Sequence, residues 1–345
     1  MKLPKEILDR VIRSQLADEE WKRNFGSVRQ IVTFKHNDNR LVAVGPEIHA
    51  SRHWKTFTEF LLEYIWLISD KEWQIRAREE HGESRHPIFL LHDSVKAFDK
   101  KAPRSADGFY LGPGCGAMNA FVHLSYDLYT LRHHSSLQRT VLDRLTRFRG
   151  QYQGARYELF VAACMVRAGF NLEFEDDADL TRKHLEFDAV DKVSGIRIGV
   201  EAKSKQRHGI LGFQAKEGRF NSKPGLQSLV KSIHLKDISQ PTIGFIDINL
   251  PPLDDLQDMF EHRYREALDE IEGVRNKHGD SVALYIVTNC GSVHCLDDER
   301  YFKVEACVSR PEQSAFPIPV DVQERVMESI MQANRIPYDF PTDDN

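Results

Sequence analysis

A glutamate and a lysine stand two residues apart in the segment RIGVEAKSK, residues 197–205, which is otherwise typical of an apolar strand. Lysine is a poor strand former, and burying an ionised pair away from water is costly. Side chains alternate across a strand, so Glu201 and Lys203 share one face, where Gly199 leaves room beside them, and the apolar side chains share the other. We therefore expect this strand either to lie at a solvated sheet edge or to hold a charged group.

A second acidic strand comes before it in the chain. The segment HLEFDAVD places Glu186 and Asp188 on one face. If the two strands pair as a hairpin through a turn at Ser194-Gly195, Asp188 lies near Glu201. Two neighbouring carboxylates repel each other unless a cation lies between them, and Mg²⁺ or Mn²⁺ prefers such oxygen ligands. Glu186 is a further candidate ligand, although a solvent-facing strand residue is the simpler interpretation.

Cleavage of a phosphodiester bond needs this combination of groups. A divalent cation neutralises the charge that develops on the phosphate and acidifies a bound water. A lysine beside it orients the attacking water or stabilises charge in the transition state. Of the three (D/E)-x-K triplets in the chain, which begin at Glu20, Asp99 and Glu201, only the last lies in an apolar strand that follows an acidic strand. The pattern predicts metal-dependent phosphodiester hydrolysis.

The elements that would position these residues follow one another closely along the chain. ARYELFVAACMVRAG predicts a helix with a glycine cap signal at Gly169. Three strands, a helix and a fourth strand follow it, at FNLEFE, HLEFDAVD, IRIGVEAKSK, about residues 224–238, and PTIGFIDINL. A further helix at about 254–275 and the strand VALYIVTN extend the order. We expect an α/β fold with a central mixed sheet and helices on both faces.

This α-β-β-β-α-β order, with Asp188, twelve intervening residues and then the EAK triplet at 201–203, resembles the PD-(D/E)XK, restriction-endonuclease-like nucleases. It resembles their Mrr-type and Holliday-junction-resolvase-like branches. The resemblance covers about residues 150–250 and implies a restriction-endonuclease-like core. An acidic residue on the preceding helix often completes the site in that family, and Glu158 stands on that helix here. One departure is Phe187, which precedes Asp188 where the family pattern has proline.

The resemblance implies metal-dependent hydrolysis of DNA, with Mg²⁺ or Mn²⁺ as the cofactor. It implies Asp188 and Glu201 as metal ligands, Lys203 as the catalytic lysine, and Glu158 as a ligand or water-positioning group. Nucleases of this family often serve restriction or anti-phage defence, and some serve repair, so the expected partners are DNA, a second copy of the chain or a defence-system protein. Two alternatives stay open: a chain that binds nucleic acid without cleaving it, and a nuclease directed at RNA or at junctions.

Basic side chains gather near this predicted site, in a chain whose net charge is −5. Nine lie from Arg197 to Lys236 against two glutamates, and a second basic stretch runs from Arg132 to Arg149. Phosphate contacts require such residues beside a metal site. We expect nucleic-acid contacts from Lys205, Arg207, Lys216, Arg219, Lys223, Lys231, Arg147 and Arg149. A solvated loop is the alternative for the first stretch, and a charged helix face or an interface for the second.

Residues 1–149 carry no motif that indicates chemistry. They predict mainly helices, among them WKTFTEFLLEYIWLI, whose apolar residues recur close to every 3.6 positions, and a long helical pattern from about Ala117 to Arg149. Two short strands predict a hairpin near residues 26–45. We therefore expect a mainly helical domain at 1–149, for recognition, dimerisation or partner docking, and a nuclease domain at 150–345 with a C-terminal helix and strand extension.

The composition, 41% hydrophobic and 29% charged, is that of an ordinary globular protein. No apolar run approaches the roughly 20 residues that span a bilayer, and the first residues carry no apolar signal segment. We therefore expect a cytoplasmic protein without a membrane partner. Five scattered cysteines argue against a disulfide framework. Cys290, His294 and Cys295 lack the spacing of a zinc knuckle and are better interpreted as ordinary residues around a turn.

Overall fold

The computed structural model describes residues 5–102, 114–134, 139–174, 184–211, 223–236, 238–252, 258–297, 303–311 and 314–341. None of the helices in these ranges is both long enough and apolar enough to cross a membrane. The first half forms α1 (Lys5–Phe25), β1 (Val32–His36), β2 (Asn39–Val44), β3 (Glu47–Ser51), α2 (Phe57–Ile68), α3 (Lys71–Glu79), η1 (Gly82–Ser84), α4 (Pro87–Asp99), α5 (Gly116–His134), α6 (Arg139–Arg147) and η2 (Arg149–Gln151). The second half forms α7 (Tyr152–Arg167), β4 (Phe170–Phe174), β5 (Phe187–Asp191), β6 (Arg197–Ser204), α8 (Gln227–His234), β7 (Thr242–Asp247), α9 (Asp258–His278), β8 (Leu284–Asn289), η3 (Gly291–His294), β9 (Glu305–Ser309) and α10 (Val320–Ala333).

The larger of two sheets has six strands in the order β4-β5-β6-β7-β8-β9. β4 pairs antiparallel with β5, and β5 pairs antiparallel with β6. β7 and β8 continue the sheet parallel to β6, and α8 and α9 lie in the crossover connections that parallel strands require. β9 returns antiparallel at the edge. The sheet is mixed, so the expected α/β class is confirmed at this level.

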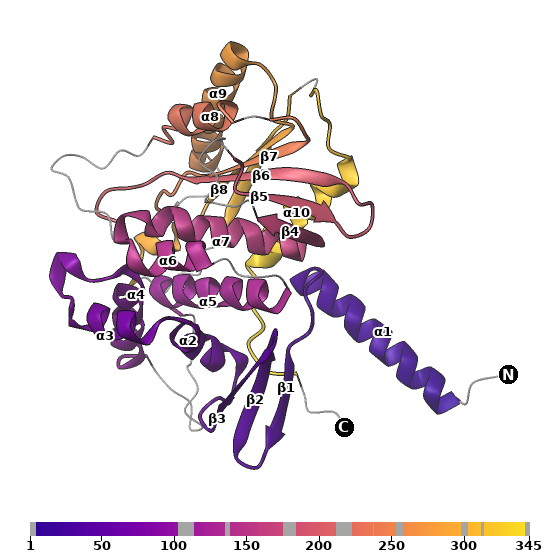
Figure 1. Cartoon of the computed structure of the whole chain (residues 1–345), viewed down its shortest axis with the longest axis vertical. Helices are drawn as coiled ribbons and strands as arrows, with labels where there is room; N and C mark the ends of the chain where they lie inside the picture. The colour runs from indigo at the N-terminus through magenta and orange to yellow at the C-terminus, as the bar shows by residue number, and fades with distance from the viewer. Residues whose placement is uncertain are drawn as a thin grey trace.

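Helices cover both faces of this sheet (Figure 1). α7 and then α5 lie on the face where Val200, Ala202 and Phe245 are buried. α8 and α9 cover the other face over Ile246 and Tyr285. Because β7 and β8 are buried on both faces, they are buried at every position, as is usual for central parallel strands. Glu201 and Lys203 alternate along β6 with Ala202, which packs in the core beneath α7, so their side chains leave the sheet on the face that α8 covers.

One apolar core runs through both halves of the chain. α5 packs against α7, and buried side chains of α2, α4, α5, α7 and the large sheet belong to the same cluster. From the C-terminal part, α10 packs on α1 and α7, and the ring of Phe340 meets the ring of Phe57 edge-on. The boundary expected at residue 150 thus falls between elements that share a core, and the division into two domains stays a prediction.

Several elements differ from those expected from the sequence. β3 adds a third strand to the hairpin near residues 26–45, and β9 and α10 complete the C-terminal part. The helical pattern from Ala117 to Arg149 forms two helices, α5 and α6, with Arg149 beyond them in η2. The end of α7 is as predicted, because Gly169 has a φ of +95°, a conformation that glycine adopts readily after a helix.

Candidate active site

The register between β5 and β6 decides which acidic side chain meets Lys203. Asp188 pairs with Gly199 across the two strands. A two-residue turn at positions 194 and 195 would have placed Asp188 opposite Glu201, and the observed register differs from that arrangement by two residues. Asp188 is therefore not directly opposite Glu201 but lies opposite Gly199, two residues before it on β6. Glu186 is instead the side chain that contacts Lys203.

The side chain of Asp191 explains this register. Its carboxylate accepts hydrogen bonds from the backbone N–H and the hydroxyl of Ser194, at 3.1 and 2.5 Å. The N–H of Gly195 donates to the carbonyl of Asp191 at 2.9 Å. Aspartate side chains that bond the backbone a few residues ahead close turns of this kind. The connection from residue 192 to 196 is therefore longer than a tight hairpin turn, and every cross-strand pair moves with it.

Lys203 lies between two carboxylates. Its Nζ is 2.7 Å from Oε1 of Glu201 and 2.9 Å from Oε1 of Glu186. Lys236, just after α8, brings a second ammonium group to 3.2 Å from the same oxygen of Glu201. Burial lowers the pKa of Lys203, but the two carboxylates outweigh burial and raise that pKa overall. Lys203 is therefore a cation at neutral pH.

Glu201 is the most deeply buried group of this cluster, with an exposed fraction of 0%. Burial raises the pKa of its carboxyl group, against the opposing effect of Lys203 and Lys236. Its Oε2 has no hydrogen-bond partner in the part of the chain that the structure describes. A buried carboxylate oxygen without a donor is unfavourable unless a cation or a water satisfies it. Glu201 is accordingly the strongest candidate metal ligand of the site.

Glu158 approaches the cluster from α7. Arg144 of α6 donates to both of its oxygens, at 3.1 Å to Oε1 and in a second close contact to Oε2. Burial, and next the repulsion from Glu186, raise the pKa of Glu158 to about 7 although Arg144 opposes the shift. α7 therefore places the carboxylate of Glu158 beside the cluster, where Arg144 binds it.

Asp188 is bound by other partners. Its Oδ2 accepts a hydrogen bond from Nη1 of Arg197 at 2.8 Å, and its Oδ1 accepts one from Nε2 of Gln240 at 2.5 Å. Gln240 and Leu185 also fill the space over Gly199, which the sequence suggested was open. Asp188 thus shares a sheet face with Glu201 and is neutralised by its own arginine.

An open cleft of about 680 Å³ borders the cluster. It lies between the start of α7, the end of β6 and α8, and its wall includes Glu158, Lys203, Lys205, Arg144 and Leu229. Three of these side chains are cations, and cations at a cleft wall are complementary to the phosphates of a nucleic acid. The predicted catalytic lysine is therefore accessible to a substrate.

The donor chemistry of the cluster suits a hard divalent cation, since Glu158, Glu186 and Glu201 supply only carboxylate oxygens. Within the described ranges, however, no three His, Cys, Asp or Glu side chains are grouped so as to hold an ion. Lys203 lies between two of the carboxylates, and Arg144 holds the third. The unpartnered oxygen of Glu201 is what fits a cation, while Lys203 and Lys236 contact its other oxygen.

The residues expected to contact nucleic acid differ in exposure. The exposed members are Lys223, Lys231 and Arg147, Lys205 lines the cleft, Arg149 is half-buried, and Lys216 and Arg219 lie outside the described residues. Lys205 also donates to the carbonyl of Gly225 at 2.6 Å, and Arg149 donates to the carbonyl of Glu83. For the exposed members and Lys205, the nucleic-acid contacts stay predictions.

Arg207 requires a correction. Its exposed fraction is 5%. Its guanidinium group donates to backbone carbonyls at distances between 2.9 and 3.3 Å, those of Ile248, Asn249, Lys223 and Pro224. A guanidinium engaged in this way holds two loops together and is not available to a phosphate, so the predicted nucleic-acid contact is wrong.

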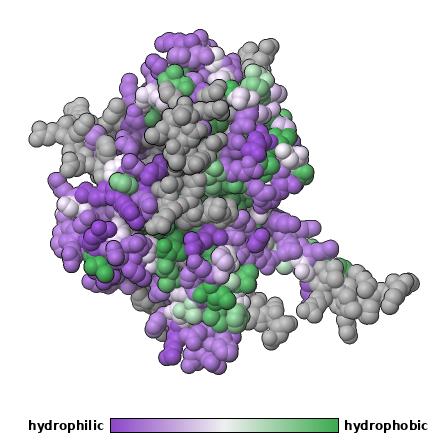
Figure 2. Space-filling view, in the orientation of Figure 1, coloured by the Kyte–Doolittle hydropathy of each residue, from purple (hydrophilic) through white to green (hydrophobic). Residues whose placement is uncertain are grey.

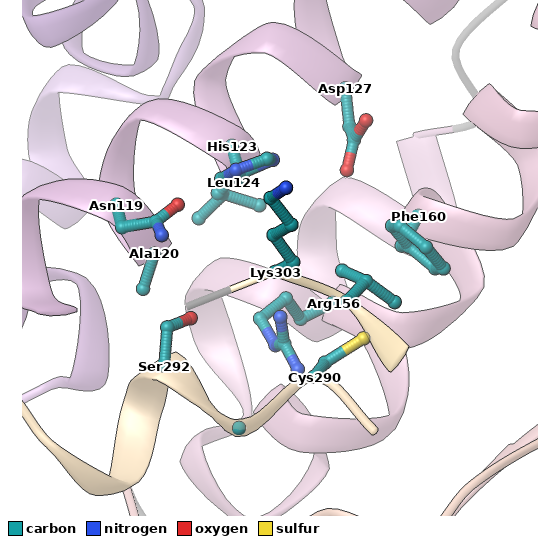
Figure 3. A pocket seen from close by; sticks show the side chains of 12 residues that line it. Asn119, Ala120, His123, Leu124, Asp127, Arg156, Phe160, Cys290, Ser292 and Lys303 are labelled. Carbon is teal, nitrogen blue, oxygen red and sulfur yellow. The ribbon is translucent and has the colours of Figure 1, made fainter. Parts of the chain in front are cut away.

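A smaller cavity lies between α5, α7 and η3 (Figure 3). Its volume is about 20 Å³, which is room for one or two waters. His123, Asp127, Arg156 and Lys303 point toward it (Figure 3). Asp127 is paired with a buried arginine of α7, and burial lowers the pKa of His123 to about 3. The cavity is too small for a nucleotide, and most of its polar lining comes from α5 and α7.

Sequence reasoning did not assign Arg144, Lys236 or Gln240 to the site. Lys236 belonged to the basic stretch, and its place at the end of a helix that follows the EAK strand was a usable signal. Arg144 and Gln240 reach their carboxylates only through the packing of α6 and of the segment before β7. No local sequence pattern predicts such contacts.

Comparisons with known protein families, with curated proteins and with solved structures gave no significant match. A functional assignment therefore depends on the geometry of the site. The resemblance to the PD-(D/E)XK nucleases stays a hypothesis that depends on the residues named above.

Proposed function

We propose that this chain is a Mg²⁺- or Mn²⁺-dependent nuclease that hydrolyses phosphodiester bonds of DNA as an endonuclease. The observation that carries the proposal is the pair of Glu201 and Lys203. A buried carboxylate with an unpartnered oxygen stands beside a lysine at the wall of a cation-lined cleft. In a purely structural ion pair, buried carboxylate oxygens are normally paired with donors.

Lys203 has the properties of a charge-stabilising donor. Burial lowers the pKa of Lys203, but Glu186 and Glu201 raise that pKa by more than burial lowers it. The ammonium group therefore stays protonated. It can donate a hydrogen bond to a non-bridging oxygen of a phosphate in the cleft, where negative charge grows during hydrolysis. Divalent metal, held by Glu201 together with Glu158 or Asp188, would neutralise the phosphate and lower the pKa of a water.

The basic residues support a nucleic-acid substrate. Arg144, Lys203 and Lys205 line the cleft, and Lys231 is exposed on α8 nearby in the fold. DNA is favoured through the resemblance alone, because RNA hydrolysis uses the same groups and discrimination lies in groove geometry. Restriction, anti-phage defence or DNA repair in the cytoplasm is the role that fits, with residues 1–149 recognising the substrate or a partner.

The decisive assay incubates the purified protein with supercoiled, linear and single-stranded DNA and with RNA, in Mg²⁺, Mn²⁺ or EDTA. We expect wild-type protein to nick or linearise supercoiled DNA only with a metal. Lys203→Met should lower the rate by roughly 100-fold or more, because it removes a charged donor to the phosphate. Lys277→Met is the matched control, since Lys277 is exposed at the end of α9, and it should keep the wild-type rate. Cleavage that survives Lys203→Met would show that the activity lies elsewhere.

A second candidate is nucleic-acid binding without cleavage. It is favoured by one observation: Arg144, Arg197 and Lys203 pair with the carboxylates of the site, as expected of a site that has lost its metal. This function predicts salt-sensitive DNA binding that does not depend on metal, with no product in any arm of the assay.

A further inference from the structure

The outer face of the three-stranded sheet β1-β2-β3 is apolar. Side chains alternate along these strands, and Val42 and Val44 point inward and are fully buried. The side chains that point outward, called here the outer face, are Val32, Phe34, Leu41, Ala43, Ile48 and Ala50. An antiparallel sheet with one face in water normally carries polar residues there. Figure 2 shows hydrophobic side chains gathered in the lower part of the molecule, where this sheet lies.

The outer face is ordered into two complete rows across the three strands. One row is Val32, Ala43 and Ile48, and the next is Phe34, Leu41 and Ala50. Ile48 has an exposed fraction of 68%. His36 and Arg52, both exposed, continue the face beyond the second row. A contiguous exposed apolar area of this kind marks an interaction surface, and here it has a basic end.

α1 is a second element with large apolar side chains in solvent. It stands away from the body of the molecule (Figure 1), and residues 12–20 are all exposed. Ile12 and Leu16 lie one turn apart on this part, and Leu16 has an exposed fraction of 59%. A projecting helix of this kind gains most of its stability from packing an apolar stripe against a surface.

We propose that α1 of one molecule packs on the outer face of a second molecule, and reciprocally, so that two chains form a dimer by arm exchange. Ile12 and Leu16 are about 6 Å apart along the helix axis, and the two rows of the outer face are about 7 Å apart along the strands. With Leu16 on the second row, Glu20 lies one turn further on, beside Arg52. The charges therefore complement each other in the same register as the apolar contacts.

The base of α1 directs it toward a second copy rather than toward its own sheet. The indole Nε1 of Trp21 donates to the carbonyl of Val28 at 2.9 Å, and Gln30 donates to Asp18 at 2.7 Å. These bonds hold the helix beside residues 28–30, with its free end away from β1-β2-β3 (Figure 1). Because one chain carries both surfaces, a two-fold dimer uses each of them twice. The inference does not depend on the proposed nuclease function.

Analytical ultracentrifugation of the full chain tests the arm exchange. Wild-type protein should sediment as a dimer in reversible equilibrium with monomer. Leu16→Glu and Ile48→Glu should each raise the dissociation constant by roughly 30-fold or more, as the loss of a central apolar contact does. Val193→Glu is the matched control, since Val193 is 88% exposed in the β5–β6 turn, and it should associate like wild type. All three positions are exposed, and circular dichroism melting curves verify that the variants fold.

A mixture of the Leu16→Glu and Ile48→Glu proteins gives the sharper result. α1 of the Ile48→Glu chain is intact and can pack on the intact outer face of the Leu16→Glu chain. Mixing should therefore restore association through one of the two contacts. A mixture that stays monomeric would overturn the pairing of arm with sheet. Dimers that survive Leu16→Glu, or wild-type protein that is monomeric at every concentration, would likewise overturn the proposal.

Discussion

Two acidic side chains, Glu186 and Asp188, lie on β5, the strand before Lys203. Either of them is a candidate for the metal ligand that the site needs in addition to Glu201. The resemblance assigns that role to Asp188, whereas Glu186 is the one in contact with Lys203. We predict that Asp188→Asn lowers the rate of DNA cleavage by roughly 100-fold or more, because it removes a proposed metal ligand. Glu186→Gln should lower the cleavage rate by only about tenfold, because it removes the ion pair that helps to position Lys203. Single-turnover rates on supercoiled DNA with Mg²⁺ measure both, and the reverse order would make Glu186 the upstream ligand.

The residue types of the site could be predicted from local pattern, and their register could not. Glu201 and Lys203 share a face because strands alternate, whereas Glu158 was a candidate only through the resemblance to the PD-(D/E)XK nucleases. The Asp191 side chain competes with a tight Ser194-Gly195 turn, and both turns are compatible with the same residues. A shift of two residues keeps every side chain on its face, so the hydrophobic pattern does not distinguish the two registers.

Arg207 and Lys231 were grouped together by charge, but Arg207 is buried and Lys231 is exposed. We predict that Arg207→Ala lowers the free energy of unfolding by about 2 to 4 kcal/mol, because it leaves buried carbonyls without donors. Lys231→Ala, at an exposed position of α8, should leave stability unchanged and weaken DNA binding with a smaller salt dependence. Urea unfolding and binding titrations at several salt concentrations measure both effects. Equal stability of the two variants would contradict the structural role given to Arg207.

At the scale of elements, an ion pair connects α10 to the large sheet. Arg325 donates to both carboxylate oxygens of Asp191 at 3.0 Å and to the carbonyl of Ala168 at 2.9 Å. Asp191 therefore joins three elements, since it also closes the β5–β6 turn through Ser194. Its removal should affect the docking of the C-terminal helix as well as the hairpin.

The protonation of Asp191 gives this connection a pH dependence. Burial raises its pKa, but the bonds from Arg325 and Ser194 outweigh burial and lower the pKa from 3.8 to about 2. A carboxyl group with a lowered pKa stabilises the fold above its ordinary pKa, and this stabilisation is lost as the pH falls through the folded value. We predict that Asp191→Asn lowers the free energy of unfolding by about 2 kcal/mol at pH 7 and by little near pH 2.

Urea titrations of wild type and Asp191→Asn between pH 7 and pH 2 measure this difference. Asp321→Asn is the control, because Asp321 is an exposed aspartate in the first turn of α10. A deficit in Asp191→Asn that does not change with pH would mean that the ionised carboxylate contributes nothing beyond its hydrogen bonds.

The elements that were predicted and those that were missed differ in the strength of their apolar pattern. β7 and β8 are buried at every position and are mostly apolar, because both of their faces are covered. α10 carries Val322, Val326 and Ile330 at helical spacing, and all three are buried, so its signal was present in the sequence. β9 is half-buried at every position and shows no alternation, which leaves pairing with β8 as the cause of its strand conformation.

At the scale of the whole molecule, the interface between α5 and α7 connects the two halves. Nη2 of Arg167 on α7 is 2.8 Å from Oδ1 of Asp127 on α5, and both side chains are buried. Breaking a buried ion pair by removing one partner is strongly unfavourable, since it leaves an uncompensated charge. Either half on its own would expose an apolar helix face. It would also leave Asp127 or Arg167 without the partner that compensates its charge.

We therefore predict that the chain unfolds as one cooperative unit. All four tryptophans lie within residues 1–149, so their fluorescence reports on the first half, while the buried thiols of Cys164 and Cys290 report on the second. In a Cys115→Ser background every reactive thiol belongs to the second half. Urea transitions followed by fluorescence and by thiol labelling should coincide, because neither half keeps its core without α5 against α7. Two separate midpoints would instead support independent domains that meet at residue 150.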